Sequence, residues 1–210
     1  MEFTITLVII VVTCLLSFPA FNNEKLKEDL LFWPYHIKRN NQYYRFLTTG
    51  FLHADAMHLI FNMIALYSFG NALEVFYYKI HFREQTLLLY ATLYITAIVI
   101  ACIPDFFKYQ DSYGYRALGA SGAVSAIVFA AITIEPTMPI RFIFIPIDIP
   151  GWIFGLAFLL LSAYLARRGG GNIGHNAHFW GAVYGVVFTW IAGKALANVD
   201  FFKLFAEKIL

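Results

Sequence analysis

Six long apolar runs divide the chain, and this pattern constrains its fold more than any other feature. The runs cover residues 3–21, 56–78, 86–103, 118–134, 151–166 and 177–196. A helix needs about 20 mostly apolar residues to cross a bilayer, because backbone groups in lipid must be satisfied within the helix. Charged residues make up only 13% of the 210 residues, whereas soluble domains carry about a quarter. We therefore predict a single-domain, all-α polytopic membrane protein of six spanning helices, with the lipid bilayer as its surroundings.

Charge and cysteine content exclude other classes of protein. The net charge is +2 and basic residues form no long run, so nucleic acid is not an expected partner. Cys14 and Cys102 both lie inside apolar runs, which does not indicate a disulfide framework. The first run could be a signal peptide, but Glu2 stands where a positive residue is usual and no small-residue cleavage site follows. We expect this run to be a retained span.

Two segments between the runs have unusual compositions. The longest polar segment, residues 22–55, is rich in aromatic residues, which argues against disorder. It is either an interfacial aromatic belt or a loop folded partly into the membrane. Its aromatic residues are Phe32, Trp33, Tyr35, Tyr43, Tyr44, Phe46 and Phe51. The apolar stretch 139–150 contains three prolines, so we expect it to lie at the interface rather than to continue a helix.

Polar residues near the start of the second span are candidates for function, because polar groups at membrane depth are costly. His58 and Asn62 are four residues apart and share one helix face. His53 precedes them by one short loop. The pair either forms helix–helix hydrogen bonds or lines a pocket of hydrogen-bond donors. Glu74 lies about 24 Å further along the same helix, at the 1.5 Å rise per residue, and we assign it a structural hydrogen bond.

The fourth and sixth spans each begin with a polar residue among small ones. Ser121 lies in the string Gly119-Ala120-Ser121-Gly122, where glycine permits a tight turn and the following helix start favours negative charge. His178 precedes Gly181 and Gly185 on one helix face. Two glycines four apart are typical of close helix packing, so the glycines have a packing explanation that the histidine lacks.

Alternate spans run in opposite directions, so the second, fourth and sixth spans start from the same side of the membrane. His58, Asn62, Ser121 and His178 each lie early in one of these spans and are therefore expected at a similar shallow depth. A serine, a histidine base and a polar cluster for an oxyanion are the components of nucleophilic acyl transfer. Because none of these three spans carries an Asp early in its buried part, we predict a Ser–His dyad rather than a triad.

These residues, taken together, resemble the rhomboid family of intramembrane serine proteases. The resemblance is carried, in the family's order, by Tyr44-Arg45, His53-x4-His58-x3-Asn62, Glu74, Gly119-Ala120-Ser121-Gly122 and Ala177-His178-x2-Gly181-x3-Gly185. It implies that Ser121 is the nucleophile and His178 the general base. It also implies an oxyanion hole formed by His58, Asn62 and the Ser121 amide.

The resemblance assigns further roles as well. Arg45 would fix the first loop, and the fifth span would be the mobile side through which a substrate helix enters. The remaining motif residues would support the structure: His53, Glu74, Gly119, Gly122, Gly181 and Gly185. Substrates would be transmembrane segments of other proteins, with no metal or cofactor. The expected location is the bacterial plasma membrane.

The chain departs from the family pattern in two respects. Some members carry an aromatic residue four positions after the nucleophile, packed on the histidine ring, where this chain has Ser125. Phe129 or an aromatic residue of the sixth span would have to replace it. The second departure concerns orientation, because the family's six-span members keep the N-terminus in the cytoplasm. That topology places 6 Lys and Arg residues inside and 9 outside, against the positive-inside rule. We follow the family.

Two other interpretations remain open. His53-x4-His58 and His175-x2-His178 resemble the histidine boxes of membrane desaturases, but such iron sites need many ligands and the chain has 6 histidines. The chain could also be a catalytically inactive relative that only binds membrane helices.

Overall fold

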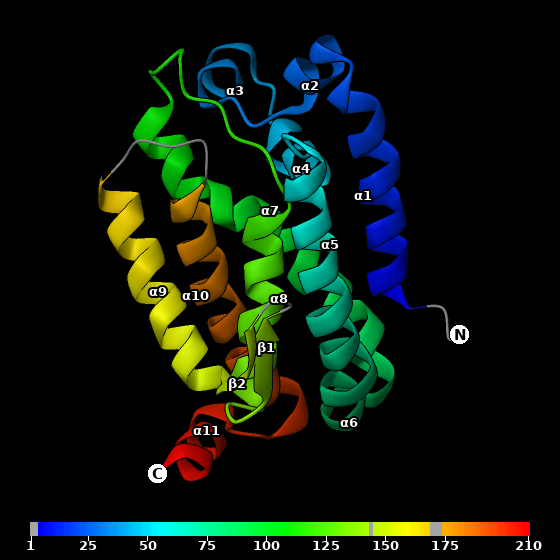
Figure 1. Cartoon of the computed structure of the whole chain (residues 1–210), viewed down its shortest axis with the longest axis vertical. Helices are drawn as coiled ribbons and strands as arrows, with labels where there is room; N and C mark the ends of the chain where they lie inside the picture. Colours follow the sequence, from blue (N-terminus) through cyan, green and yellow to red (C-terminus); the bar gives the residue numbers. More distant parts are fainter. Residues whose placement is uncertain (1–3, 143–144, 169–173) are drawn as a thin grey trace.

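The computed structural model describes residues 4–142, 145–168 and 174–210, which form an upright bundle of helices (Figure 1). The longer helices are α1 (Ile5–Phe21), α5 (Ala56–Asn71), α7 (Thr86–Tyr109), α8 (Ser121–Ile134), α9 (Gly151–Arg168) and α10 (His175–Ala192). The shorter ones are α2 (Glu24–Leu30), α3 (Pro34–Asn40), α4 (Arg45–Thr48), α6 (Lys79–Phe82) and α11 (Phe201–Ile209).

Helix α8 forms the centre of the bundle. Every residue of its 14 except Ser121 is buried, and α10, α7 and α5 pack around it. Figure 1 shows α2 and α3 at one end of the bundle and α11 at the other. The apolar core therefore surrounds the helix that begins with the candidate nucleophile.

The region between α5 and α7 is one helical run that folds back on itself. A π-helical segment, Ala72–Tyr78, continues α5 into α6, and the chain reverses near Arg83, whose φ is 50°. Helix α7 then continues through Pro104 to Tyr109, beyond the predicted end at residue 103. A proline inside a membrane helix is tolerated where neighbouring groups compensate for the lost hydrogen bond.

Three helical segments among the described residues are long and apolar enough to cross a membrane: Ala56–Tyr109, Gly151–Arg168 and His175–Ala197. Helices α1 and α8 are apolar but shorter. The prediction of a mostly helical membrane protein is therefore confirmed. Helix length and composition identify three candidate spans rather than the six predicted.

The prediction of an all-α fold is wrong for the stretch that follows α8. Strands β1 (Pro139–Phe142) and β2 (Ile145–Pro150) form an antiparallel hairpin, with Pro139 opposite Pro150. Arg141 Nε donates to Asp148 Oδ1 across it at 2.8 Å. Proline lacks the N–H that a helix interior requires, and it is tolerated at the first residue of a strand. The prolines that argued against a helix here also frame the hairpin.

The segment between α1 and α5 is folded rather than extended. It contains α2, α3, α4 and a 3₁₀ turn at Thr49–Phe51. Phe32 pairs with Ala117 in an isolated β-bridge, which attaches this segment to the residues that lead into α8. The first loop is thereby joined to the start of the helix that carries Ser121.

Candidate active site

Ser121 and His178 are in direct contact. Ser121 is the first residue of α8 and His178 lies in the first turn of α10, so both side chains occupy the same end of the bundle. His178 Nε2 is 2.7 Å from Ser121 Oγ, which is hydrogen-bond distance. Both residues are partly exposed rather than sealed in the core. The two residues predicted as a dyad are thus brought together from separate helices.

The turn before Ser121 depends on Gly119. Its φ is +132°, a conformation that only glycine adopts readily. A Cβ at this position would lie 2.8 Å from Cε1 of His58, 3.1 Å from its Nε2 and 3.8 Å from Ser121 Oγ. The missing side chain therefore allows the His58 ring to lie against the Gly119 backbone, close to the Ser121 hydroxyl.

Backbone amides at the start of α8 add hydrogen-bond donors beside Ser121. The first N–H groups of a helix have no acceptor four residues earlier, and the dipole of the helix favours negative charge there. Within α8 the first such bond that forms runs from the Val124 N–H to the Ala120 carbonyl. The Ser121 amide precedes this bond and can therefore stabilise an oxyanion. The Ser121 hydroxyl beside it is placed to transfer its proton to His178.

Asn62 lies one turn further along α5 than His58. It is buried, and its Nδ2 donates to the His58 carbonyl at 2.9 Å. Its own helix thus orients this amide, which keeps a second N–H. The structure brings Ser121, His178 and His58 together, and Asn62 joins this group through its bond to the His58 carbonyl.

His53 connects α1 with the start of α8. The Ser17 hydroxyl donates to the Phe51 carbonyl at 2.9 Å, so it accepts from Nδ1 of His53, 3.0 Å away. Nε2 of His53 is then the acceptor, and it faces the Ala120 amide at 3.5 Å. The fully buried His53 thereby holds the residue immediately before Ser121.

The glycines of α10 produce a backbone-to-backbone contact with α8. A methyl group on Gly181 would overlap the carbonyl oxygen of Gly122, and one on Gly185 would overlap that of Ala126. A methyl group on Gly122 would lie 2.8 Å from Cβ of Ala101. The close contact fixes the two dyad helices against each other directly below the Ser121–His178 pair.

Asp105 is a site residue that the sequence analysis missed. This buried carboxylate of α7 accepts from Nδ2 of Asn176 at 2.6 Å and from the Tyr115 hydroxyl at 2.7 Å. Asn176 is in the first turn of α10, two residues before His178, and Tyr115 is in the segment that leads to Ser121. The sequence analysis predicted a dyad because the starts of the second, fourth and sixth spans carry no buried Asp. Asp105 lies two residues beyond the predicted end of the third run at residue 103, in the part of α7 that continues to Tyr109.

An aromatic ring does lie beside His178, but it comes from α9. The Phe158 ring is 6.1 Å from the His178 ring, at an interplanar angle of 32°. Phe129 of α8 contacts Phe158 at 5.5 Å. The His175 ring of α10 also lies 5.9 Å from the His178 ring. The expectation of Phe129 or an aromatic residue of the sixth span did not include Phe158, which contacts both Phe129 and His178.

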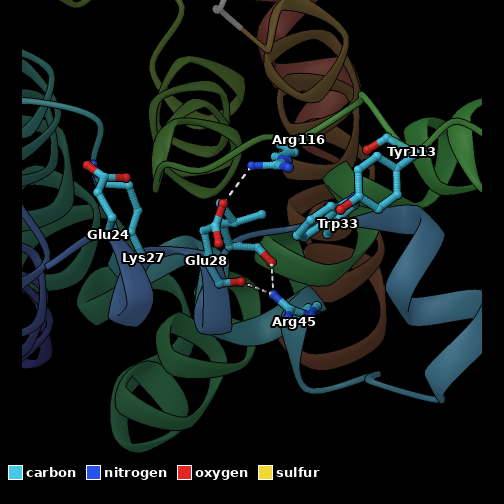
Figure 2. A network of polar contacts seen from close by, with 8 residues as sticks. Glu24, Lys27, Glu28, Trp33, Arg45, Tyr113 and Arg116 are labelled. Atoms are coloured by element: carbon cyan, nitrogen blue, oxygen red, sulfur yellow. Dashed lines mark hydrogen bonds and ion pairs between the residues drawn. The ribbon is translucent and has the colours of Figure 1, made fainter.

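Arg45 organises the first loop (Figure 2). Its buried guanidinium donates through Nη1 to the carbonyls of Glu28 at 2.6 Å and Leu31 at 2.9 Å. Arg116 donates to the Glu28 carboxylate at 2.8 Å and lies over the Trp33 ring at 3.9 Å. The helices of the loop are thus held to the residues just before α8.

Glu74 lies away from this cluster, as expected from its distance along the helix. Its carboxylate accepts from the backbone amides of Ile5 at 2.7 Å and Thr6 at 2.9 Å. These are the first amides of α1, which a helix leaves without partners. In the described part of the chain, no group of three or more His, Cys, Asp or Glu side chains is arranged to hold a metal ion.

Comparisons with known proteins agree with the geometry. The model of the rhomboid domain family matches residues 40–195. Rhomboid-like protein 15 of Arabidopsis thaliana is 29% identical over 67% of this chain. RHOMBOID-like protein 12, mitochondrial, of the same plant is 28% identical over 71%, and Rhomboid protein 1, mitochondrial, of Saccharomyces cerevisiae is 26% identical over 70%. The aligned regions span only 36%, 46% and 41% of these relatives.

Proposed function

Because the chain belongs to the rhomboid family, we propose that it is an intramembrane serine endopeptidase with a Ser121–His178 dyad. The observation that carries the proposal is the 2.7 Å contact between Ser121 Oγ and His178 Nε2. A serine hydroxyl is a weak nucleophile until a base accepts its proton. The contact provides that base from a separate helix.

The reaction begins when Ser121 Oγ attacks the scissile carbonyl carbon while His178 Nε2 takes the hydroxyl proton. The resulting imidazolium gives this proton to the leaving amine as the peptide C–N bond breaks. Water then attacks the acyl-enzyme, with His178 again as base, and the carboxylate product leaves. Each step needs only Ser121, His178 and water.

The developing oxyanion lies at the start of α8 in this mechanism. The Ser121 amide donates to it with the help of the helix dipole. The His58 ring lies against Gly119, close to the Ser121 hydroxyl, and a ring N–H there adds a second donor. Asn62 contributes through the N–H that its bond to the His58 carbonyl leaves over.

The membrane arrangement is part of the proposal. Six spans result if the shorter apolar helices α1 and α8 cross together with α5, α7, α9 and α10. Substrates are then transmembrane segments that reach the dyad at the end of the bundle. Two relatives are called mitochondrial, so the comparisons give no support to the predicted bacterial plasma membrane. We propose only that the protein is integral to a membrane.

The test is covalent labelling of the purified protein by a fluorophosphonate probe, together with cleavage of a model transmembrane substrate. Ser121→Ala and His178→Ala should each abolish cleavage, and Ser121→Ala should abolish labelling. Ser68→Ala is the matched control, because Ser68 is an exposed serine of α5. A folded wild-type protein that is neither labelled nor active would be the inactive helix-binding relative instead.

Chelation separates the dyad from a histidine-box metal enzyme. A serine nucleophile with a histidine base requires no metal ion, so dialysis against a chelator should leave the cleavage rate unchanged. Loss of cleavage that added zinc or iron restores would contradict the dyad.

A further inference from the structure

Helix α9 supplies one of two rings that lie beside the catalytic histidine. The other is the His175 imidazole of α10, whose centroid is 5.9 Å from that of His178 at an interplanar angle of 89°. The ring centroids of Phe158 and His178 are 6.1 Å apart, with 32° between their planes, within the range of favourable aromatic contacts. The helix that carries Ser121 offers no ring one turn later. The residue there is Ser125, whose hydroxyl donates to the Ser121 carbonyl at 2.8 Å.

Phe158 is itself held by other rings. Phe129 of α8 packs on it at 5.5 Å, and Phe154, one turn earlier on α9, packs on it at 5.8 Å. The Phe158 side chain therefore bridges α8 and the histidine of α10. Its partners on both sides are side chains rather than backbone.

The helix that carries Phe158 is weakly packed. Of its 18 residues only Gly151, Gly155 and Ser162 are buried. Leu156, Leu160 and Leu161, on either side of Phe158 in sequence, are exposed. A helix with so few buried contacts opens or shifts at a lower free-energy cost than the central helix.

We propose that Phe158 is a positioning residue that keeps the His178 ring aligned with Ser121, so that the position of α9 controls whether the dyad is competent. This inference rests on the proposed function, because it concerns how the same site is regulated. When α9 is in place, its ring limits the imidazole to the orientation that contacts Ser121 Oγ. When α9 moves away, the imidazole loses that support.

The first experiment compares Phe158→Leu with Tyr164→Leu on a model transmembrane substrate. Misaligning a catalytic group by about 1 Å can cost up to about a hundredfold in rate. Phe158→Leu should therefore lower kcat about tenfold to a hundredfold with little change in KM. Tyr164→Leu removes an aromatic ring from an exposed position of the same helix, and it should leave kcat within about twofold. Equal losses in the two variants would overturn the proposal.

A second variant separates positioning from general packing. Adding Ser125→Tyr to Phe158→Leu provides a ring one turn after Ser121, at the position where some family members carry an aromatic residue packed on the histidine. The double variant should recover most of the lost kcat, although α9 still lacks its phenylalanine. If kcat stays low in the double variant and its melting temperature equals that of Phe158→Leu, the ring is not what positions His178.

A readout without catalysis distinguishes this inference from the proposed function. Solid-state NMR of ¹⁵N,¹³C-histidine-labelled protein in lipid bilayers reports the mobility of the His178 ring, which His178→Ala assigns. The ring should be rigid in the wild type and mobile in Phe158→Leu. An inactive wild type with this behaviour would contradict the protease but not the positioning role. A ring that stays rigid in Phe158→Leu would contradict the positioning role alone.

Discussion

The two helices that flank α8 on the dyad side contact it in opposite ways. Helix α10 approaches through Gly181 and Gly185, whose Cα atoms face carbonyl groups of α8 with no room for a methyl group. Helix α9 approaches with Gly155 opposite the ring of Phe129, and a Cβ there would lie 3.4 Å away, in ordinary contact. One interface is backbone against backbone, and the other is side chain against side chain.

The difference assigns separate tasks to the two interfaces. The α8–α10 contact fixes the distance between the backbones that carry Ser121 and His178, since close-packed backbones cannot slide without a clash. The α9 contact determines only the surroundings of the His178 ring, through side chains that can change rotamer. The α8–α10 interface thus fixes the backbones of the dyad rigidly, whereas the side chains of the α9 interface can adjust.

Breaking the rigid interface should have the largest effect. Gly181→Ala places a methyl group on the Gly122 carbonyl. Overpacking costs about 1–3 kcal/mol and occasionally more, and a rigid backbone group can yield less than a side chain. We expect a large fall in melting temperature and loss of cleavage, both measured in detergent. An active Gly181→Ala protein of unchanged stability would show that the two helices can separate without harm.

Loss of Asp105 should have an intermediate effect, because it ties α10 to α7 rather than to α8. Asp105→Ala leaves the partly buried donors of Asn176 and Tyr115 without their acceptor. An unpaired buried group costs about 1–3 kcal/mol, and less where water reaches it. The start of α10 should loosen, which lowers both kcat and the melting temperature.

Asp105→Asn is the matched variant for that experiment. Its amide can still accept from one partner and donate to the other, since Asn176 can turn its own oxygen and the Tyr115 hydroxyl can accept. It should retain most of the activity that Asp105→Ala loses. Asp111→Asn, on the exposed side of the same region, should behave as the wild type. Equal loss in Asp105→Ala and Asp105→Asn would mean that the charge matters and the hydrogen bonds do not.

The smallest effect should follow from adding a methyl group at the adjustable α8–α9 interface. Gly155→Ala adds a methyl group at ordinary contact distance from Phe129 and replaces a residue with poor helix propensity. The free energy of unfolding should change by less than about 1 kcal/mol, with cleavage near the wild-type rate. Comparison with Gly181→Ala makes this a direct test, because both variants add the same single methyl group. A loss as severe as that of Gly181→Ala would remove the distinction between the two interfaces.

The sequence predicted those features that depend on spacing along one helix. Period and length marked the apolar helices, and the four-residue interval between Gly181 and Gly185 indicated close packing. The common direction of alternate spans placed Ser121 and His178 at one depth. None of these inferences required knowledge of which helices are neighbours.

What the sequence could not predict depends on contacts between helices of unrelated spacing. Asp105 reaches Asn176 and Tyr115 because α7 continues to Tyr109, past the predicted end of the third run at residue 103. Phe158 meets His178 because α9 lies beside α10, which no periodicity specifies. The hairpin at β1 and β2 escaped the prediction of an all-α fold because an interfacial apolar stretch has the same composition in either form.

Glu74 has a consequence for the order in which the protein is made. Its carboxylate completes the first turn of α1, yet it lies 69 residues after Ile5. During synthesis α1 leaves the ribosome well before its partner exists, and its leading amides must be solvated by water or lipid headgroups in the interval. Helix α1 therefore lacks the acceptor of its first amides until Glu74 has been synthesised. Completion of this helix end is coupled to the later part of the chain through a single carboxylate, at the end of the bundle opposite to Ser121 and His178.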